Sequence, residues 1–329
     1  MRAHTFRFLA AAAFVALAAP VLAEPSGSIT VYTSQPSEQM QAVVDAFNKD
    51  YPNVTVDVFR SGTTEVMSRL QAELTAGSSP ADIVLLADAV ALTQLKNAGH
   101  LLTYADAPVR DIPEALVDAD KTYFGTKLIT TGIVYNTNLV QKPPKSWNDL
   151  VAAEVASKTI MPSPLYSGAA VIHVGTMAQQ GEFGWDYYDT LAENGAVAGQ
   201  GNGTVIEAVA NGEKAYGIII EYMAFNAKKK GSPVEFVFPE EGVSSISQPV
   251  AILKGTDNEE AAKAFVDWQL SRTAQEQSVA QGYFPIVDGV ASPEGYPEAK
   301  SLKILPTDHG AILANDEANK KMFAELFGG

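Results

Sequence analysis

The sequence predicts an α/β fold in which a mostly parallel β-sheet is covered by helices on both faces. Two observations lead to this prediction. Strand-like and helix-like patterns alternate along the chain, an order typical of parallel strands joined by helical crossovers. The chain has 329 residues and no cysteine, so packing in a core of ordinary size has to hold it together without disulfides.

The region after residue 23 shows three successive units of strand followed by helix. The strand segments are short and rich in β-branched residues, whereas the helical segments place apolar residues on one face. We expect strands at Ser28–Thr33, Val54–Phe59 and Ala81–Leu86, and helices at Glu38–Asn48, Glu65–Ala76 and Ala89–Ala98. Because ligands of such sheets bind beyond the carboxyl ends of the strands, the loops of interest are 34–37, 60–64 and 87–88.

A second alternating unit occupies the rest of the chain. A Pro-rich turn at 142–150 leads into a helix, and another helix begins within the sequence YSGAAVIHVGTMAQQ. The remaining expected elements are strands at Lys127–Asn136, Thr159–Pro164, Ala215–Tyr222 and Ser245–Leu253, and an amphipathic helix at Glu259–Arg272.

The first 23 residues have the three parts of a secretory signal peptide. Two arginines give a positive start, Phe8–Ala19 is an apolar run without charge, and residues 21–23 offer a cleavage site. The run is short for a spanning helix and Pro20 interrupts it, which argues against a membrane anchor. We therefore expect a soluble mature chain that begins near Glu24 and works in the periplasm, without lipid attachment at a cysteine.

The charge and the motifs exclude several classes of function. The formal net charge is −15 at pH 7, and such a surface repels nucleic acid and anionic lipid. No GxSxG, HExxH, phosphate-loop or GxGxxG motif is present. We therefore predict no catalytic residue, no cofactor and no nucleic-acid partner. A secreted hydrolase, with a triad assembled only in space, is the remote alternative.

The motifs, taken in order, resemble a family of two-lobed periplasmic solute-binding proteins of ABC importers. They are similar to its ferric-iron-binding branch and to the relatives that bind phosphorylated or phosphonate solutes. The matching stretches are ITVYTSQ, SPADIVLLAD, TGIVYNTNLV, KSWNDL, PSPLYSGAA, AVANGEKAYGIIIEY and GYFPIVDGV.

The resemblance implies a specific organisation of the chain. Each lobe would be a mostly parallel sheet flanked by helices, with the ligand in the cleft between the lobes. The chain would cross between lobes near 126–131 and 245–250, so that lobe one comprises 24–128 and 251–329 and lobe two comprises 129–250. The implied partners are a small anionic or zwitterionic ligand and an inner-membrane permease, and we expect a monomer.

The resemblance also identifies the positions at which ferric relatives hold iron. In this chain they are Pro36, Ala87 and the pair Glu221-Tyr222, so one tyrosine of the usual set is kept. Iron(III) is a hard cation that needs several charged oxygen or imidazole donors. We predict no metal site, although ferric iron with a synergistic anion is an alternative ligand. We expect the mature histidines at the surface or at helix caps: His100, His173 and His309.

The anion half of the relatives' site corresponds to Ser167-Gly168-Ala169. Independently of the family, a serine followed by small residues at a helix start offers free N–H groups, a hydroxyl and the positive end of the helix dipole. Ser61 and Thr63 precede another helix in the same way, and Ser34 follows the first strand. The alternative for each is helix capping without a ligand.

Acidic residues at the expected cleft suggest that the ligand also carries a cation. Asp88 follows the third strand, and Glu221 ends a buried apolar strand beside Tyr222. Carboxylates would repel an anion, whereas an ammonium could lie between them and the ring of the tyrosine. The sequence therefore predicts a phosphonate zwitterion such as 2-aminoethylphosphonate. A sugar phosphate, with the two acids accepting hydroxyl hydrogens, is the alternative, and Asp88 could instead only cap a helix.

Overall fold

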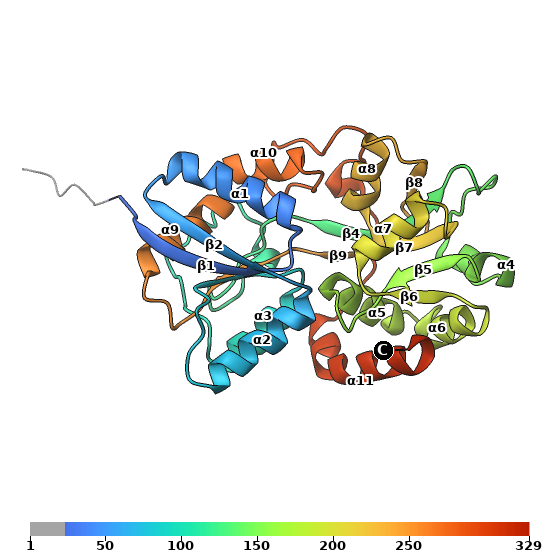
Figure 1. Cartoon of the computed structure of the whole chain (residues 1–329), viewed down its shortest axis with the longest axis horizontal. Coiled ribbons are helices and arrows are strands. Elements are labelled where there is room, and N and C mark those ends of the chain that lie inside the picture. The colour runs from blue at the N-terminus through green and yellow to red at the C-terminus, as the bar shows by residue number, and fades with distance from the viewer. Residues whose placement is uncertain (1–23, 329) are drawn as a thin grey trace, which may run out of the picture.

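The structure, a computed structural model, describes residues 24–328. It shows two α/β lobes side by side, each built on its own sheet (Figure 1). The expected signal peptide lies outside the described residues. Because the lobes have separate sheets and separate cores, the line along which they meet is where a ligand cleft would lie.

The first lobe has a four-stranded sheet in the order β10-β3-β1-β2. Strand β1 pairs in parallel with β2 and β3, and β10 joins β3 antiparallel. The strands are β1 (Gly27–Thr33), β2 (Val54–Arg60), β3 (Ile83–Leu85) and β10 (Val250–Ile252). The helices of this lobe are α1 (Ser37–Asp50), α2 (Thr63–Thr75), α3 (Ala89–Asn97), α9 (Glu259–Gln269) and α10 (Arg272–Ala280), and a short helical turn, η1 (Glu114–Leu116), follows α3.

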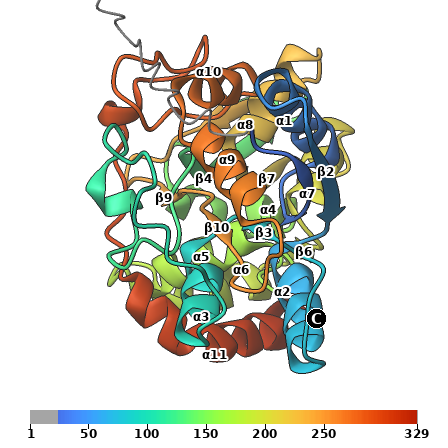
Figure 2. The ribbon, with the colours of Figure 1, turned by 90° about the vertical axis from the view of Figure 1, so that its left-hand side faces the viewer.

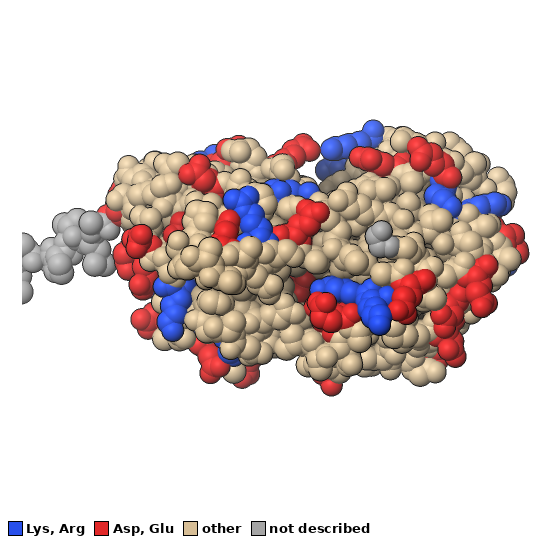
Figure 3. Space-filling model, turned by 60° about the horizontal axis from the view of Figure 1, so that its bottom comes forward, with Lys and Arg blue, Asp and Glu red and all other residues tan. Residues whose placement is uncertain are grey.

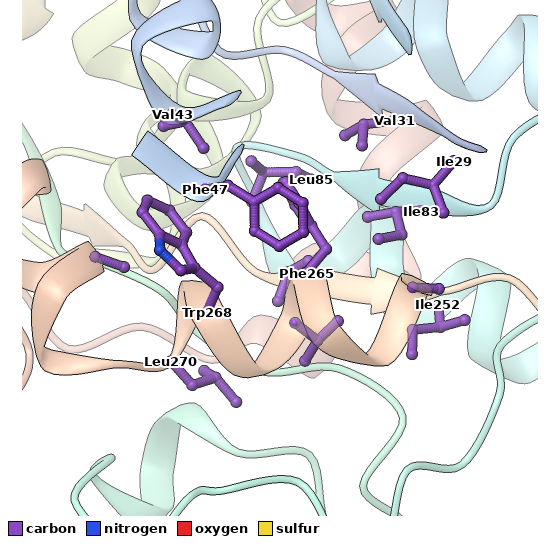
Figure 4. Close-up of a cluster of buried hydrophobic side chains, with 14 of the residues drawn as sticks. Ile29, Val31, Val43, Phe47, Ile83, Leu85, Ile252, Phe265, Trp268 and Leu270 are labelled. Carbon is purple, nitrogen blue, oxygen red and sulfur yellow. The ribbon is translucent and has the colours of Figure 1, made fainter. Parts of the chain in front are cut away.

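Alternate side chains of this sheet enter two different cores, as the period of two in a strand requires. Ile29, Val31 and Leu85 pack with Phe47 of α1 and Phe265 of α9 on one face (Figure 4). On the other face the intervening side chains of the same strands pack against α2 and α3. Figure 2 views this lobe with α9 in front of the sheet. The expected helical cover on both faces is therefore present.

The second lobe has a mixed sheet in the order β6-β5-β7-β4-β8, with β9 also paired to β4. Its parallel pairs are β5–β6 and β5–β7, whereas β4 runs antiparallel to β7, β8 and β9. The mostly parallel character expected for both lobes thus holds only in the first. The strands are β4 (Ile129–Asn136), β5 (Thr159–Pro162), β6 (Val197–Gly199), β7 (Tyr216–Ile220), β8 (Val234–Val237) and β9 (Ser244–Ile246).

Helices cover both faces of the second sheet as well. Side chains of α7 and α8 pack with Val134 and Ile219 on one face, and α5 and α6 pack with Ile133 and Ile218 on the other. The helices are η2 (Trp147–Leu150), α4 (Ala153–Ala156), α5 (Gly168–Gln179), α6 (Gly184–Glu193), α7 (Asn202–Ala210) and α8 (Glu221–Lys229).

Two neighbouring segments carry the chain between the lobes. Residues 124–131 and 244–250 run antiparallel, with Ile129 opposite Ile246 and the N–H of Thr126 donating to the carbonyl of Ser247 at 3.0 Å. The single strand expected at 245–253 is divided into β9 and β10, which belong to different sheets. The division falls at Gln248, whose φ of 40° lies in the left-handed region, and at the proline that follows it.

The C-terminal part of the chain returns to the second lobe. After the turn η3 (Ala299–Ser301), helix α11 (His309–Phe327) lies along α5 and α6 (Figure 1). Phe323 of α11 is fully buried beside Tyr188 of α6. The sequence assigned these residues to lobe one, but their apolar contacts are mainly with lobe two.

The surface of the described residues matches the acidic composition. Acidic side chains are spread over the face drawn in Figure 3, with lysines and arginines among them. Within residues 24–328, none of the helices is both long enough and apolar enough to span a bilayer.

Candidate functional site

A cavity of about 170 Å³ lies between the two lobes. From the first lobe it is lined by the loops that follow β1, β2 and β3, as expected for a parallel sheet. These contribute Ser34, Gln35, Pro36, Arg60, Thr63 and Ala87. From the second lobe it is lined by the first residues of α5, α7 and α8, which contribute Tyr166, Ser167, Gly168, Ala169, Asn202 and Tyr222.

Of the helices that begin at this cavity, three are preceded by a small residue, glycine or serine. Helix α2 follows Gly62, α5 follows Ser167 and α7 follows Gly201, and each of these preceding residues lines the cavity. The first backbone N–H groups of a helix have no partner within the helix, and the macrodipole adds positive potential there. Gly62 and Gly201 have no side chain with which to cap those groups. The cavity is therefore suited to an anion.

Ser167 lies at the centre of a hydrogen-bond network at this point. Its hydroxyl oxygen accepts from the N–H of Ala170 at 3.3 Å and from Nδ2 of Asn202 at 3.1 Å. The Oδ1 atom of Asn202 in turn accepts from the N–H of Ile220 at 3.2 Å. The network joins the starts of α5 and α7 to the end of β7, and it leaves the hydroxyl hydrogen of Ser167 available to a ligand.

Arg60 is the single formally charged residue of the lining. Its Nη1 donates to the hydroxyl of Tyr166 at 3.2 Å, and its Nη2 lies 3.5 Å from the carbonyl oxygen of Ser34. Arg60 is exposed and belongs to the first lobe, whereas Tyr166 belongs to the second. The guanidinium therefore bridges the lobes at the rim of the cavity.

Three buried oxygen atoms of the lining have no hydrogen-bond partner among the described residues. They are Oγ of Ser34, Oγ1 of Thr63 and Oε1 of Gln248. Buried polar atoms in folded proteins nearly always have a partner. Their clustering in one cavity indicates that a polar molecule is expected there.

The lobes also touch each other directly beside the cavity. The N–H of Thr64 donates to the carbonyl of Tyr166 at 3.4 Å. A Cβ added to Gly62 would lie 2.5 Å from that same carbonyl oxygen. A Cβ added to Gly168 would overlap Oδ2 of Asp88 and would lie 2.7 Å from Oγ1 of Thr63. Glycine at these two positions allows the lobes to come this close.

Two predicted cation-binding acids lie outside the cavity lining. Asp88 is 2% exposed, and its Oδ1 accepts from the N–H of Ala91 at 2.8 Å, so it caps α3. Glu221 is fully buried, and its Oε2 accepts from the N–H of Thr130 at 2.6 Å. Burial raises the pKa of Asp88 to about 6 and that of Glu221 to about 8. Neither residue is among those that line the cavity.

The placement of Glu221 follows from where a strand ends. The sequence predicted a strand through Tyr222, but β7 ends at Ile220 and Glu221 begins α8. An acid in the first helical turn is favoured by the dipole. The change of backbone direction turns Glu221 toward β4 and leaves Tyr222 in the lining, its ring 4.4 Å from that of Tyr283. Burial raises the pKa of the Tyr222 hydroxyl.

Of the other predicted site residues, Ser34, Thr63 and Ser167-Gly168-Ala169 line the cavity, and Ser61 does not. The hydroxyl of Ser61 instead donates to the carboxylate of Glu65. The sequence reasoning missed Tyr166, Gln248 and the start of α7. The glycine-rich run 199–203, directly before an apolar helical stretch, was the signal that could have indicated another helix N-terminus.

The iron positions of the ferric relatives offer few donors here. Pro36 and Ala87 line the cavity with side chains that have no ligand atom. Within residues 24–328 no cluster of three or more His, Cys, Asp or Glu side chains is suited to a metal ion. His173, expected at the surface or at a cap, is buried in α5, where its Nδ1 lies 3.0 Å from Oγ of Ser244 and burial lowers its pKa to about 3.

Comparisons with solved structures agree with this architecture. AfuA from Actinobacillus pleuropneumoniae, solved with exogenous fructose 6-phosphate bound, is 23% identical, with a TM-score of 0.83 over 92% of this chain and 99% of AfuA. Iron-bound HitA from Pseudomonas aeruginosa is 20% identical, with a TM-score of 0.80 over 91% of this chain and 99% of HitA. These similarities show the two-lobed periplasmic binding protein fold.

Sequence comparisons identify the family. A probable ABC transporter periplasmic-binding protein, y4fP of Sinorhizobium fredii, is 27% identical over 276 residues, which cover 80% of this chain and 74% of the relative. The family model for bacterial extracellular solute-binding proteins matches residues 42–304. The chain therefore belongs to the bacterial extracellular solute-binding protein family.

Proposed function

We propose that this protein is the periplasmic substrate-binding protein of an ABC importer, which captures a small organic phosphate and delivers it to a membrane permease. The family supports the receptor role, and the Sinorhizobium fredii relative is named as a probable component of such a transporter. The observation that best supports the ligand class is the meeting of three helix N-termini at one cavity.

A phosphoryl group fits this cavity better than a carboxylate does. It has three terminal oxygens that can accept from donors on several sides. The starts of α2, α5 and α7 supply N–H groups from both lobes, and Ser167 can add a hydroxyl hydrogen. Arg60 adds one formal positive charge at the rim. The lining contains no carboxylate that would repel the anion.

The remainder of the ligand should be polar and uncharged. Gln35, Gln200, Asn202 and Gln248 line the cavity with amide groups, and amides both donate to and accept from hydroxyl groups. We therefore favour a phosphate ester that carries several hydroxyls, such as a sugar phosphate. AfuA, which shares the fold, was solved with such a molecule bound.

The zwitterion 2-aminoethylphosphonate is the second candidate. Its phosphonate would use the same helix starts, and the ring of Tyr222 in the lining is a surface on which an ammonium can bind. It ranks lower because Asp88 and Glu221 are not in the lining. Ferric iron with an anion ranks third, since Tyr222 is the single predicted iron donor in the lining.

Ligand capture in this proposal involves bending at the two crossing segments. Lobe one would comprise residues 24–128 and the part of the chain from 251 that precedes α11, and lobe two would comprise 129–250 together with α11. The direct contacts of Thr64 and Arg60 with the Tyr166 region would then form as the lobes close. The closed form would be the one that the permease recognises.

The test uses the purified chain from residue 24, with calorimetry and thermal unfolding against matched compounds. Fructose 6-phosphate should bind, and fructose, which lacks the phosphoryl group, should not. At 100 times its dissociation constant the ester should stabilise the protein by about 2.7 kcal/mol. Tighter binding of 2-aminoethylphosphonate than of any phosphate ester would favour the second candidate, and binding of ferric iron alone would refute the proposal.

Two further measurements check the receptor role. Phosphorus NMR of ligand released after a long incubation should show it unchanged, because the proposal involves binding without turnover. N-terminal sequencing of protein released from the periplasm by osmotic shock should begin at or near Glu24. Hydrolysed ligand would favour the secreted-hydrolase alternative, and an intact Met1 on cytosolic protein would refute the location.

A further inference from the structure

The crossing segment before β4 contains a buried lysine without a counter-ion. Lys127 has no exposed surface, and no carboxylate within residues 24–328 forms an ion pair with it. Its Nζ donates to Oε1 of Gln35 at 3.3 Å and lies 4.6 Å from the centre of the Tyr283 ring. Burying an unpaired ammonium costs free energy, so we expect Lys127 to have a function that offsets this cost.

Lys127 lies one side chain behind the wall of the ligand cavity. Gln35, which accepts its hydrogen bond, lines the cavity, and so does Gln248, whose Nε2 lies 3.5 Å from the same oxygen of Gln35. The ring of Tyr283 packs on that of Tyr222, a third lining residue. The ammonium is therefore connected to the cavity on two sides.

The backbone supports this arrangement at a conformational cost. Gln248 has a φ of 40°, which is unusual for a residue with a side chain. Its carbonyl accepts from the hydroxyl of Thr126 at 2.7 Å, directly beside Lys127. Its Oε1 is buried without a partner. The strained residue and the lysine thus belong to one connected unit at the crossing between the lobes.

We propose that Lys127 is the buried counter-charge of the bound anion, and that anion binding is accompanied by uptake of a proton at its Nζ. The inference rests on the proposed function, because it needs an anion in the cavity. Lys127 acts through Gln35 and the intervening space and does not touch the ligand. It would make the site select doubly charged phosphoryl groups over singly charged ones.

The protonation equilibria fix the sign of this effect. Burial lowers the pKa of Lys127 to about 7, so near pH 7.5 the amine is largely neutral without a ligand. A bound anion favours the charged form and raises that pKa. By linkage, each unit by which the anion raises the pKa of Lys127 means that the protein with charged Lys127 binds the anion ten times more tightly than the protein with neutral Lys127. The affinity should therefore fall as pH rises from about 6.5 to 8.5.

Proton uptake by other titratable groups near the cavity has to be distinguished from uptake by Lys127. Glu221, whose pKa burial raises to about 8, lies beside Tyr222, and an anion would also favour its protonated form. Burial raises the pKa of Tyr222, Tyr283 and Tyr296 far above this range. Glu221 and Asp88, whose pKa burial raises to about 6 and whose Oδ2 lies beside Gly168 of the lining, are thus the competing proton acceptors.

The experiment is calorimetry with fructose 6-phosphate at pH 7.5, in buffers of different ionisation enthalpy. At this pH the ester is mostly dianionic, since its second pKa is about 6. A one-unit rise in the Lys127 pKa predicts uptake of about half a proton. Lys127→Met should abolish the uptake and weaken binding about tenfold at pH 6.5. Two control variants should keep proton uptake at Lys127. Lys263→Met removes a partly exposed lysine of α9, and Glu221→Gln removes a competing carboxyl group.

The other possible results of this experiment would each refute a specific part of the proposals. Binding by the wild-type protein without proton uptake would overturn the role of Lys127 and leave the proposed function standing. Uptake that persists in Lys127→Met and disappears in Glu221→Gln would assign the proton to Glu221 instead. Failure of both fructose 6-phosphate and inorganic phosphate to bind would overturn both proposals. If Lys127→Met does not fold, the wild-type protein and Glu221→Gln still test the proposal, because absent uptake in the wild type refutes it and uptake lost in Glu221→Gln assigns the proton to Glu221.

Discussion

Gly168→Ala should block closure of the lobes while leaving each lobe folded. Gly168 is the first residue of α5 in the second lobe, and the added methyl group would overlap Oδ2 of Asp88 from the first lobe. Asp88 is 2% exposed and caps α3, so it has little room to move. Oγ1 of Thr63 would lie 2.7 Å from the added methyl group and blocks its other side.

The magnitude follows from the cost of overpacking. Inserting a methylene into a well-packed contact costs about 1–3 kcal/mol, and here the contact forms only when the lobes meet. The whole cost therefore falls on ligand binding, which corresponds to a loss of about 5- to 150-fold in affinity. The free energy of unfolding of the open protein should stay equal or rise, because alanine is a better helix former than glycine.

Calorimetry with fructose 6-phosphate measures the affinity, and small-angle scattering with and without the ester measures closure. Gly255→Ala is the control, since an added Cβ there has no neighbour within 4 Å. Combining Gly168→Ala with Asp88→Ser should restore part of the affinity, because serine still caps a helix but is shorter than aspartate. Unchanged affinity and full compaction of Gly168→Ala would refute the reasoning.

Three other predictions concern single side chains. Ser167→Ala should weaken phosphoryl ligands about ten- to hundredfold by calorimetry, since it removes a hydrogen bond to a charged group; equal affinity would show that the hydroxyl is only a cap. Burial raises the pKa of Glu221 to about 8. Protonation of Glu221 therefore stabilises the folded protein, and this contribution is fully present below the ordinary pKa of a glutamate. The contribution is lost as pH rises through about 8. Thermal unfolding of Glu221→Gln should therefore lose less stability than the wild type between pH 5 and 8, and parallel curves would contradict this. Glu221→Gln should also leave the ratio of affinities for 2-aminoethylphosphonate and ethylphosphonate unchanged, and selective loss of the aminated ligand would restore the zwitterion hypothesis.

Local pattern was sufficient for the three strand–helix units of the first lobe and for the start of α5. The expected strand and helix at 28–33 and 38–48 correspond to β1 and α1 within two residues at each end. Period-two and period-3.6 spacing is a local property, and so is the sequence Ser167-Gly168-Ala169 at a helix start. These features are encoded by neighbours in the chain, which is why they could be predicted.

The tertiary structure decided which side chains share the cavity. Arg60 and Tyr166 meet across the lobes, and Gln248 reaches the cavity because the chain turns sharply between β9 and β10. Glu221 is outside the cavity lining because β7 ends at Ile220, two residues before the end of the predicted strand. These outcomes depend on contacts between residues that lie far apart in the sequence, such as Arg60 with Tyr166 and Gln35 with Gln248, and on the residue at which the backbone changes direction. The sequence by itself therefore determined the family fold and one helix start that lines the cavity, whereas long-range packing decided the charge and polarity of the lining.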